Sequence, residues 1–282
     1  MTKKHKIKKR SLSSMLIFLF LVICLIIHLM PLGMVILGSL KTYSEVMTNV
    51  LSWPQTFSFV NYADVFMKMN YPKAFGNTLF VTVIGVSGIV LLGSMAGYKL
   101  SRVKTRFSYI LFLLCIMPMM IPFQSFMITL VQIAKKMGFI NNLLGLGIIY
   151  WGLGAPMAIF LYHGFTKGIP LELEECALLD GCSSWRMFRK IVFPLLKPVT
   201  ASVIVVNAMW LWNDFLLPLL IIGTSKSGKT LQLSAYTFMG QYKMEWQNIM
   251  AAAVLSIIPA LIIYLIFQKN IVKGLVAGAV KG

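Results

Sequence analysis

Apolar positions along the chain gather into six long stretches separated by shorter polar segments. The stretches lie at about 15–38, 77–98, 107–130, 143–165, 198–222 and 248–268. Each is close to the roughly 20 residues that a helix needs to cross the hydrocarbon core of a bilayer. The pattern predicts an all-α membrane protein with six transmembrane helices, folded as a single domain over 1–282, with both ends of the chain on one side.

Composition agrees with this interpretation. Hydrophobic residues make up 58% of the chain, charged residues 12%, and the mean hydropathy is +0.81. An ordinary soluble domain carries about a quarter charged residues, so this class is excluded. The basic start MTKKHKIKKR before the first stretch is also typical of a secretory signal. That stretch exceeds the apolar length of a signal and lacks a small-residue cleavage site, which favours an uncleaved first span.

The position of the basic residues decides what the net charge of +18 means. Segments 1–14, 99–107, 164–198 and 268–282 hold 18 of the 26 Lys and Arg. Lys and Arg accumulate in the cytoplasmic segments of membrane proteins. The charge therefore predicts that both termini and segment 164–198 are cytoplasmic, and it does not favour a nucleic-acid partner.

Segment 164–198 is a charged island that holds half of the eight carboxylates. Pro170 suits the first turn of a helix, where no amide donor is needed. Three acidic residues follow near the positive end of that helix dipole, namely Glu172, Glu174 and Glu175. We expect a first short helix here.

The second half of the island predicts a tight corner and a second helix. Gly181 fits the left-handed position that ends a helix, and Ser183 or Ser184 can cap a helix over Trp185–Ile191. Two prolines, Pro194 and Pro198, are expected to close the element. The whole is a cytoplasmic hairpin over 166–197.

The hairpin carries a spaced motif. Its positions are Glu175, Cys176, Ala177, Gly181, Ile191, Phe193 and Pro194. The segment resembles the "EAA" loop of bacterial ABC importer permeases, E-A-A-x3-G-x9-I-x-L-P, with Cys176 in place of the usual Ala and Phe193 in place of Leu. An ordinary cytoplasmic helical hairpin is the alternative interpretation.

Other segments extend the resemblance over nearly the full chain. They are Asn61-Tyr62 with Gly76-Asn77-Thr78, GYKLSR at 97–102, NAMWLWNDFLLP at 207–218 and the tail at 274–282. Together they resemble the second, shorter permease of carbohydrate importers of the maltose type.

The resemblance implies a type I ABC importer permease fold in which the hairpin is a coupling helix docked on a separate ATPase. The implied coupling residues are Glu175, Cys176, Ala177, Leu178, Asp180, Gly181, Phe188 and Pro194, and an apolar face of Leu178, Leu179 and Phe188 is expected to seat the helix. The tail residues Ala279, Val280, Lys281 and Gly282 are expected to contact the ATPase.

The same resemblance implies the partners and the location. We expect a second permease subunit forming a heterodimer, two copies of an ABC ATPase that bind ATP and Mg, an extracellular solute-binding protein, and membrane lipid. The solute would be a sugar of di- or oligosaccharide size, and an importer for a non-sugar solute is the alternative. The chain would be a multi-pass protein of the bacterial plasma membrane with no cofactor of its own.

Three polar or aromatic residues in the fifth stretch are candidates for the translocation path: Trp210, Asn213 and Asp214. A carboxylate inside a span is costly and is a functional candidate by default. Asp214 lies about 24 Å along the span, where it can pair with a neighbouring helix, Asn213 or water, line the solute path, or relay protons in an ion-coupled secondary carrier. Trp210 and Trp212 point about 200° apart, so at most one faces the path, and packing is the alternative for both.

No residue set predicts catalysis. Gly223 to Thr230 satisfies G-x4-G-K-[ST], but a phosphate loop must join a buried strand to a helix, and this segment follows a membrane span. A flexible external linker explains it better. Cys176 and Cys182 lie six residues apart with no His nearby, which does not predict a metal site. We expect a non-enzymatic subunit.

Small residues and prolines in the spans predict close and adjustable helix packing. Gly93 and Gly97 form a small-xxx-small pattern in the second stretch. Prolines occur inside the third to sixth stretches, where neighbouring helices or an aqueous path must satisfy the freed carbonyls. Both features are typical of a moving helix bundle.

Overall fold

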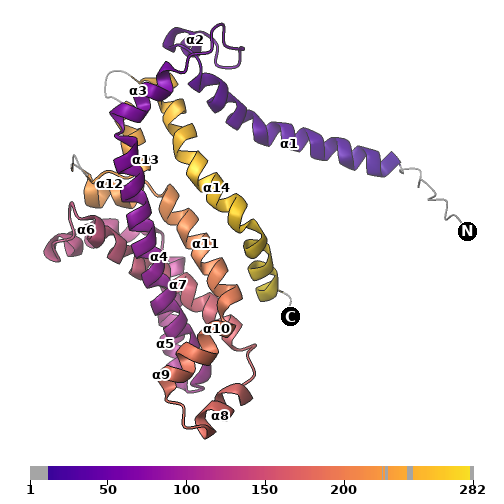
Figure 1. Ribbon diagram of the computed structural model, residues 1–282, viewed down its shortest axis with the longest axis vertical. Helices are drawn as coiled ribbons and strands as arrows, with labels where there is room; N and C mark the ends of the chain where they lie inside the picture. Colours follow the sequence, from indigo (N-terminus) through magenta and orange to yellow (C-terminus); the bar gives the residue numbers. More distant parts are fainter. Residues whose placement is uncertain (1–11, 224, 226–227, 240–243, 280–282) are drawn as a thin grey trace, which may run out of the picture. The chain divides into compact units, whose positions relative to one another are not determined.

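The computed structural model describes residues 12–223, 225, 228–239 and 244–279. Most of these residues are helical, and within them no β-strand forms beyond one isolated bridge between Met239 and Met244. The chain divides into two compact units, the first over 1–67 and 238–255 and the second over 68–237 and 256–282. Figure 1 labels the helices of both.

The first unit contains α1 (Leu12–Ser39), α2 (Tyr43–Thr48), most of α3 (Val60–Lys68) and the start of α14 (Trp246–Ala279). Asn61 ties this unit together, because its side-chain amide donates 2.8 Å hydrogen bonds to the carbonyls of Ser39 and Lys41. The Lys41 ammonium is buried and donates in turn to the carbonyls of Asn49 and Val50. The loop after α1 is thereby held in one conformation.

The second unit contains the remaining helices. In chain order they are α4 (Tyr71–Arg102), α5 (Arg106–Ile116), η1 (Met117–Met120), α6 (Phe123–Lys136), α7 (Leu143–Thr166), α8 (Glu172–Leu179), α9 (Ser184–Met187), the π-helix η2 (Phe188–Val192), α10 (Phe193–Leu195), α11 (Lys197–Asn213), α12 (Leu216–Ile222), α13 (Leu231–Ala235), η3 (Tyr236–Phe238) and the later part of α14.

The core of the second unit lies along α4 and α7, which pack side by side with α11 against them (Figure 1). The predicted close contact of Gly93 and Gly97 is confirmed. A Cβ added at Gly93 would lie 2.5 Å from the Cβ of Ala158, and one added at Gly97 would lie 3.0 Å from the backbone of His163. Because neither position has room for a side chain, the two helix backbones can approach closely.

Four described helices are long and apolar enough to cross a membrane, and the number rises to six if each of two bent helix pairs is one span. The segment predicted as a span over 107–130 is not one continuous helix. The chain breaks after η1 and bends by 104° before α6. Pro118 and Pro122 explain the break, since each removes an amide donor from the helical ladder.

The segment predicted as a span over 198–222 is likewise not one continuous helix, because α11 ends at Asn213 and α12 begins at Leu216. Pro218 has no amide hydrogen to bond to the carbonyl of Asp214, four residues earlier, so the ladder opens there. Asp214 takes an extended ψ of 131°. It therefore lies at a helix break instead of inside a span. Helices α4 and α14 extend beyond the spans predicted at 77–98 and 248–268.

Candidate functional site

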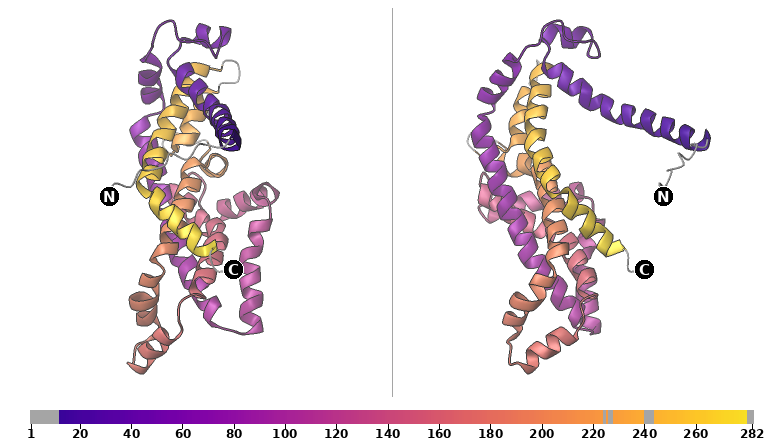
Figure 2. Two further views of the ribbon diagram at one scale, coloured as in Figure 1. Left: turned by 90° about the vertical axis from the view of Figure 1, so that its right-hand side faces the viewer. Right: turned by 45° about the vertical axis from the view of Figure 1, so that its right-hand side comes forward.

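The charged island folds into the predicted hairpin between the end of α7 and the start of α11. Gly181 takes the left-handed conformation with a φ of +72° after α8 ends. Of the two candidate caps, Ser183 begins the next helix, accepting a 3.4 Å hydrogen bond from the amide of Arg186. Both views of Figure 2 place this hairpin at one end of the second unit.

The proline predictions for the hairpin need correction. Pro170 does not occupy the first turn, because α8 begins at Glu172 with Leu171 as its N-cap. Pro194 does not end the second helix either. A π-helical turn over Phe188–Val192 precedes it, and the chain stays helical to Leu195. Since Pro194 lies in the first turn of α10, its missing amide hydrogen removes no required bond.

Glu174 anchors α8 to the end of α4. Its carboxylate is 5% exposed and accepts 2.7 Å hydrogen bonds from Arg102 Nε and from the Tyr98 hydroxyl. Arg102 also donates from Nη2 to the carbonyl of Ile169, at 3.0 Å. The Glu174 carboxylate and the Arg102 guanidinium are thus paired and hydrogen-bonded, as buried charges require. No sequence signal was used to predict this contact, although Tyr98 and Arg102 stand four apart on one helix face.

The predicted coupling residues divide into an exposed and a buried group. The exposed group is Glu175, Cys176, Leu178, Asp180, Gly181 and Pro194. Ala177 and Phe188 are buried, at 5% and 7% exposure. The ring of Phe188 packs on Tyr98 at a centroid distance of 5.4 Å.

The apolar face predicted from Leu178, Leu179 and Phe188 therefore needs correction. Phe188 belongs to the core of the chain. Leu178 is 55% exposed, Leu179 is 88% exposed, and Trp185 is 56% exposed. These last three side chains are the most exposed apolar groups of the hairpin, and Trp185 among them was not predicted.

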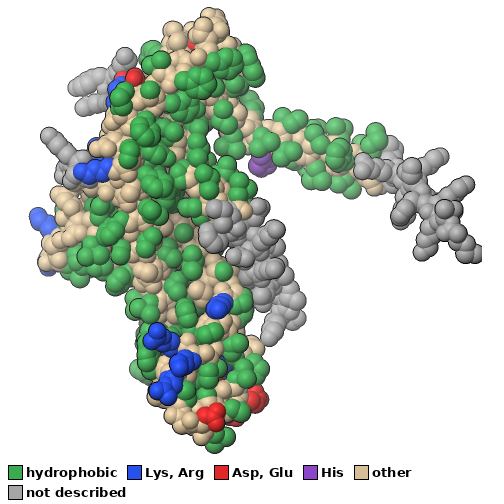
Figure 3. Space-filling model, viewed as in Figure 1, with side chains coloured by type: hydrophobic (Ala, Val, Ile, Leu, Met, Phe, Trp, Pro, Cys, Tyr) green, Lys and Arg blue, Asp and Glu red, His purple; other side chains and the backbone are tan. Residues whose placement is uncertain are grey.

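Charge is segregated on the hairpin. The exposed acidic residues lie on α8 and at its end, namely Glu172, Glu175 and Asp180. The exposed basic residues follow the corner, namely Arg186, Arg189, Lys190 and Lys197. Figure 3 shows the acidic side chains at the tip of this end and the basic ones further along. The tip thus combines exposed acidic and apolar side chains on one surface.

The two helix breaks meet at one pocket. It has a volume of about 340 Å³ and includes Pro118 and Gln124 from the α5–α6 break and Trp210 and Asp214 from the α11–α12 break. Discontinuous helices commonly form the solute sites of transporters, because their free backbone groups line a cavity. The structure thus brings two of the three predicted path residues together.

Asp214 pairs with a neighbouring helix, one of the alternatives considered for it. Its carboxylate accepts a 2.7 Å hydrogen bond from the Tyr150 hydroxyl on α7 and a 3.0 Å bond from the amide of Leu216. Asn213 does not line the pocket, and its side chain donates to the carbonyl of Met209.

The two tryptophans of α11 have different environments. Trp212 is 2% exposed and packs edge-on against Phe75, whereas Trp210 is 41% exposed and lines the pocket. Of the two tryptophans, Trp210 alone lines this pocket.

Two other predicted features lie partly outside the described residues. The Gly223–Thr230 segment follows α12 and precedes the five-residue α13, so its described part lacks the strand that a phosphate loop requires. Residues 224 and 226–227 are not described. In the tail, Ala279 is the last residue of α14, and Val280, Lys281 and Gly282 lie outside the described residues.

Comparison with known proteins identifies relatives of this chain. The chain is 40% identical over 267 residues to the "Probable starch degradation products transport system permease protein AmyC" of Thermoanaerobacterium thermosulfurigenes, covering 95% of this chain and 96% of that protein. It is 36% identical to the "Multiple sugar-binding transport system permease protein MsmG" of Streptococcus mutans, covering 91% and 93%.

A solved structure matches the fold. It is that of a bacterial ABC transporter involved in the import of the acidic polysaccharide alginate, with a TM-score of 0.77 and 20% identity, covering 93% of this chain and 99% of that one. The pattern that defines the family "Binding-protein-dependent transport system inner membrane component" matches residues 89–276. That match takes in the hairpin, both helix breaks and the helices that carry them. The chain belongs to this family of inner membrane components of binding-protein-dependent transport systems.

Proposed function

We propose that the chain is a transmembrane permease subunit of an ABC importer for a sugar, of di- or oligosaccharide size, and that separate subunits hydrolyse ATP. Relatives with 40% and 36% identity carry names of sugar transport permeases, which supports the solute class. The observation that carries the coupling role is the clamped hairpin, with Glu174 held by α4 and Leu179 88% exposed at the tip.

The complete importer would contain this chain, a second permease subunit, two copies of an ABC ATPase with ATP and Mg, and an extracellular solute-binding protein. Membership of a binding-protein-dependent family supports this set of partners. The excess of Lys and Arg in 1–14, 99–107, 164–198 and 268–282 supports an orientation with both termini in the cytoplasm. The hairpin then faces the ATPase.

The hairpin would transmit force as a rigid element. Closure of the ATPases displaces the tip residues, from Glu175 to Gly181, and the Glu174–Arg102 pair passes the displacement to α4. Because α4 packs along α7 at glycine positions with no free space, these helices move together. Residue Ala279 and the tail beyond it would contact the same ATPases.

The solute would pass the pocket between the two helix breaks. Trp210 presents a partly exposed aromatic surface there, which suits the apolar face of a pyranose. Asp214 keeps acceptor capacity beyond its bonds to Tyr150 and Leu216, since a carboxylate has about four lone-pair sites. Sugar hydroxyl groups are donors of the matching kind. Asn213, which is not among the residues that line the pocket, would have no direct part.

The docking role is tested by affinity purification of the tagged chain from its own host and identification of the co-purifying chains. We expect an ABC ATPase with the wild type, and its loss with Leu179→Asp, which puts a charge in the apolar contact. Leu51→Asp is the matched control, since Leu51 is 59% exposed and lies in the loop after α2. Absence of an ATPase with the wild type, or its retention with Leu179→Asp, refutes the docking surface.

An ion-coupled secondary carrier is the second candidate, and the Tyr150–Asp214 pair is the observation that favours it. Uptake into membrane vesicles separates the two. An ATP-driven importer loses uptake when ATP is depleted and keeps it when a proton uncoupler is added. The opposite result supports the carrier.

A further inference from the structure

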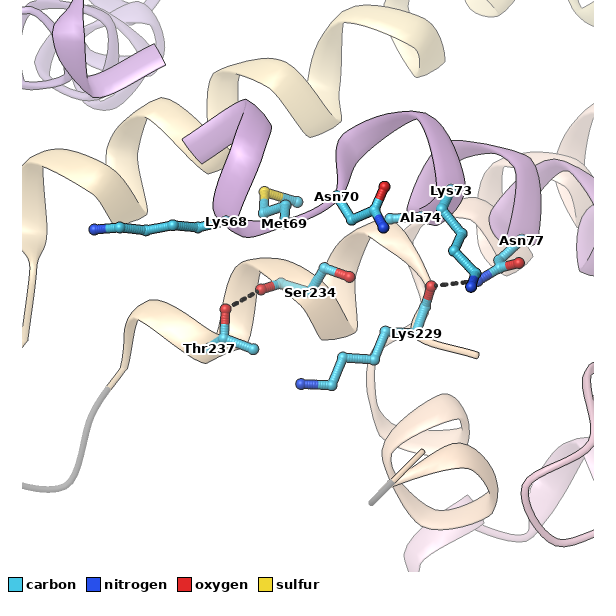
Figure 4. A pocket seen from close by; sticks show the side chains of 9 residues that line it. All are labelled: Lys68, Met69, Asn70, Lys73, Ala74, Asn77, Lys229, Ser234 and Thr237. Atoms are coloured by element: carbon cyan, nitrogen blue, oxygen red, sulfur yellow. Dashed lines mark hydrogen bonds between the residues drawn. The ribbon is translucent and has the colours of Figure 1, made fainter. Parts of the chain in front are cut away.

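A polar pocket lies at the amino-terminal end of α4, about 48 Å along this helix from the Glu174–Arg102 pair. Its volume is about 110 Å³, and by the same measure a single water needs about 10–15 Å³. It is lined by Lys68, Met69, Asn70, Lys73, Ala74, Asn77, Lys229, Ser234 and Thr237 (Figure 4). The space suits one small polyatomic ion.

The electrostatics of this pocket favour an anion. Three of its lining residues are lysines, and none is Asp or Glu. The amino terminus of α4 also lies in its wall, and the positive end of a helix dipole attracts anions. The N-cap residue Asn70 has a φ of 47° and its side chain makes no capping hydrogen bond. Its amide is therefore available to a ligand.

A buried hydroxyl group gives an independent indication of a ligand. Ser234 is 2% exposed, and its Oγ has no hydrogen-bond partner within the described residues. Buried polar side chains are nearly always paired, so an orphan in a pocket wall needs an explanation. In Figure 4 this hydroxyl points into the space between Asn70 and Lys229, away from Thr237, which is bonded to the Ser234 carbonyl instead.

The two sides of the pocket are tied together. The Asn77 side chain donates a 2.9 Å hydrogen bond to the carbonyl of Lys229, and the Thr78 hydroxyl accepts one of 2.9 Å from the amide of Leu231. Lys229 is thereby held opposite the start of α4. Its ammonium group contributes a localised positive charge there. The described part of the segment that carries it does not have the strand-to-helix geometry of a phosphate loop.

We propose that this pocket binds a phosphate group, either free phosphate or the phosphodiester of a lipid headgroup. Helix amino termini are established binding sites for phosphate groups, and the tetrahedral oxygens of a phosphate can meet lysines on both sides of the pocket at once. Lys73 and Lys229 bind its oxygens electrostatically, and Ser234 donates the hydrogen bond that it lacks within the chain. Because α4 is a candidate membrane span, a headgroup at the bilayer surface can reach its end.

The test measures binding to the purified full-length chain in a neutral detergent. One arm titrates sodium phosphate against sodium chloride at equal ionic strength and follows the thermal unfolding midpoint. The other arm adds dioleoyl phosphatidylglycerol or dioleoylglycerol, which lacks the phosphate, and counts bound lipids by native mass spectrometry. The variants are Lys73→Gln, Lys229→Gln and Ser234→Ala, with Lys135→Gln as the control for removing an exposed lysine outside the pocket.

Binding of either phosphate probe, weakened at least tenfold by Lys73→Gln and Lys229→Gln and unchanged by Lys135→Gln, supports the proposal. The arm that responds identifies the source of the phosphate. Lys229→Arg, which keeps the charge, restores binding.

The proposal is overturned if chloride or dioleoylglycerol acts as well as the phosphate probe, if neither probe binds, or if the pocket variants bind like the wild type. Equal unfolding midpoints without ligand exclude misfolding as the cause. Since no transport is measured, the outcome is independent of the coupling role of the hairpin.

Discussion

Arg102 Nε lies 2.7 Å from Glu174 Oε1, and the two side chains are only 15% and 6% exposed. This pair joins the last residue of α4 to the first turn of α8, across 72 positions of sequence. Because the Tyr98 hydroxyl binds the other carboxylate oxygen, α8 is held at two points. The orientation of the hairpin thus depends on α4 as well as on the connecting chain.

We expect Glu174→Ala to lower the free energy of unfolding by about 3–5 kcal/mol, because it leaves the buried Arg102 charge without its partner. The same change should speed amide hydrogen exchange in α8. Glu175→Ala is the matched control, since Glu175 is exposed, and it should change stability by less than about 0.5 kcal/mol. Equal effects of the two substitutions would show that the pair does not anchor the hairpin.

Substitutions of Gly181 test the corner of the hairpin through backbone strain alone. A Cβ at this position would meet no atom within 4 Å, but the φ of +72° is unfavourable for other residues. Gly181→Ala should therefore cost about 1–2 kcal/mol of stability, and Gly181→Asn less, since Asn tolerates this conformation. Gly164→Ala, in open space on α7 without a positive φ, should be neutral or slightly stabilising. Thermal unfolding in detergent measures all three, and an unchanged midpoint for Gly181→Ala would count against the strain argument.

Close packing of α4 on α7 predicts a contrast between two glycines of the same helix. Gly97→Ala should destabilise the chain by about 1–3 kcal/mol, because the new methyl group would lie 3.0 Å from the backbone of Ile159 and 2.6 Å from the Cβ of Tyr162. Gly76→Ala meets nothing within 4 Å and should be neutral or stabilising by up to about 1 kcal/mol through helix propensity. Comparison of their unfolding midpoints checks the helix interface. A similar response at both sites would mean that α7 does not approach α4 this closely.

Short-range sequence signals predicted the corner and the helix cap of the hairpin. They could not predict its contacts with distant parts of the chain. Gly181 and Ser183 act within a few residues, through a left-handed φ and a capping hydrogen bond, so their roles follow from the sequence. The Glu174–Arg102 pair depends on how α8 returns to α4, which no local pattern encodes. Phe188 was assigned to the outer face on the resemblance alone, and its helix is too short for periodicity to indicate which side is buried.

The helix breaks show a different limit of sequence analysis. Average hydropathy continues through Pro118 and Pro218, so an apolar window predicts one uninterrupted span in each case. The loss of an amide donor decides the local structure instead, and it places Asp214 at a helix end. The prolines were noted as signs of flexibility, but a pocket shared by two breaks follows only from the tertiary arrangement.

The capping box of α2 predicts a pH dependence. The backbone amides of Thr42 and Gln55 donate to the Glu45 carboxylate and, with the Thr42 hydroxyl, lower its pKa below the usual value. A lowered pKa means that this contribution is fully present above the pKa of the unfolded state and is lost as pH falls through the lowered value. Amide exchange over Tyr43–Thr48 should therefore rise, relative to the intrinsic rate, on acidification below about pH 4. Glu45→Gln should make that protection insensitive to pH, and persistence of the acid response in this variant would assign it to another group.

Asp214→Asn separates a structural acceptor from a proton carrier. An Asn side chain keeps an oxygen that can accept the hydrogen bond from Tyr150, which holds α7 beside the α11–α12 break, but it cannot ionise. In an ATP-driven importer, uptake should then stay within about tenfold of the wild type, since the hydrogen bond is kept in a weaker, uncharged form and a hydrogen bond contributes about 0.5–1.5 kcal/mol. Asp214→Ala removes the acceptor, leaves the largely buried Tyr150 hydroxyl unpaired and should reduce uptake more. Solute uptake by vesicles, with and without an uncoupler, measures both variants. Complete loss of uptake in Asp214→Asn, with normal amounts of protein in the membrane, would require a titratable group at this helix break and would favour ion coupling.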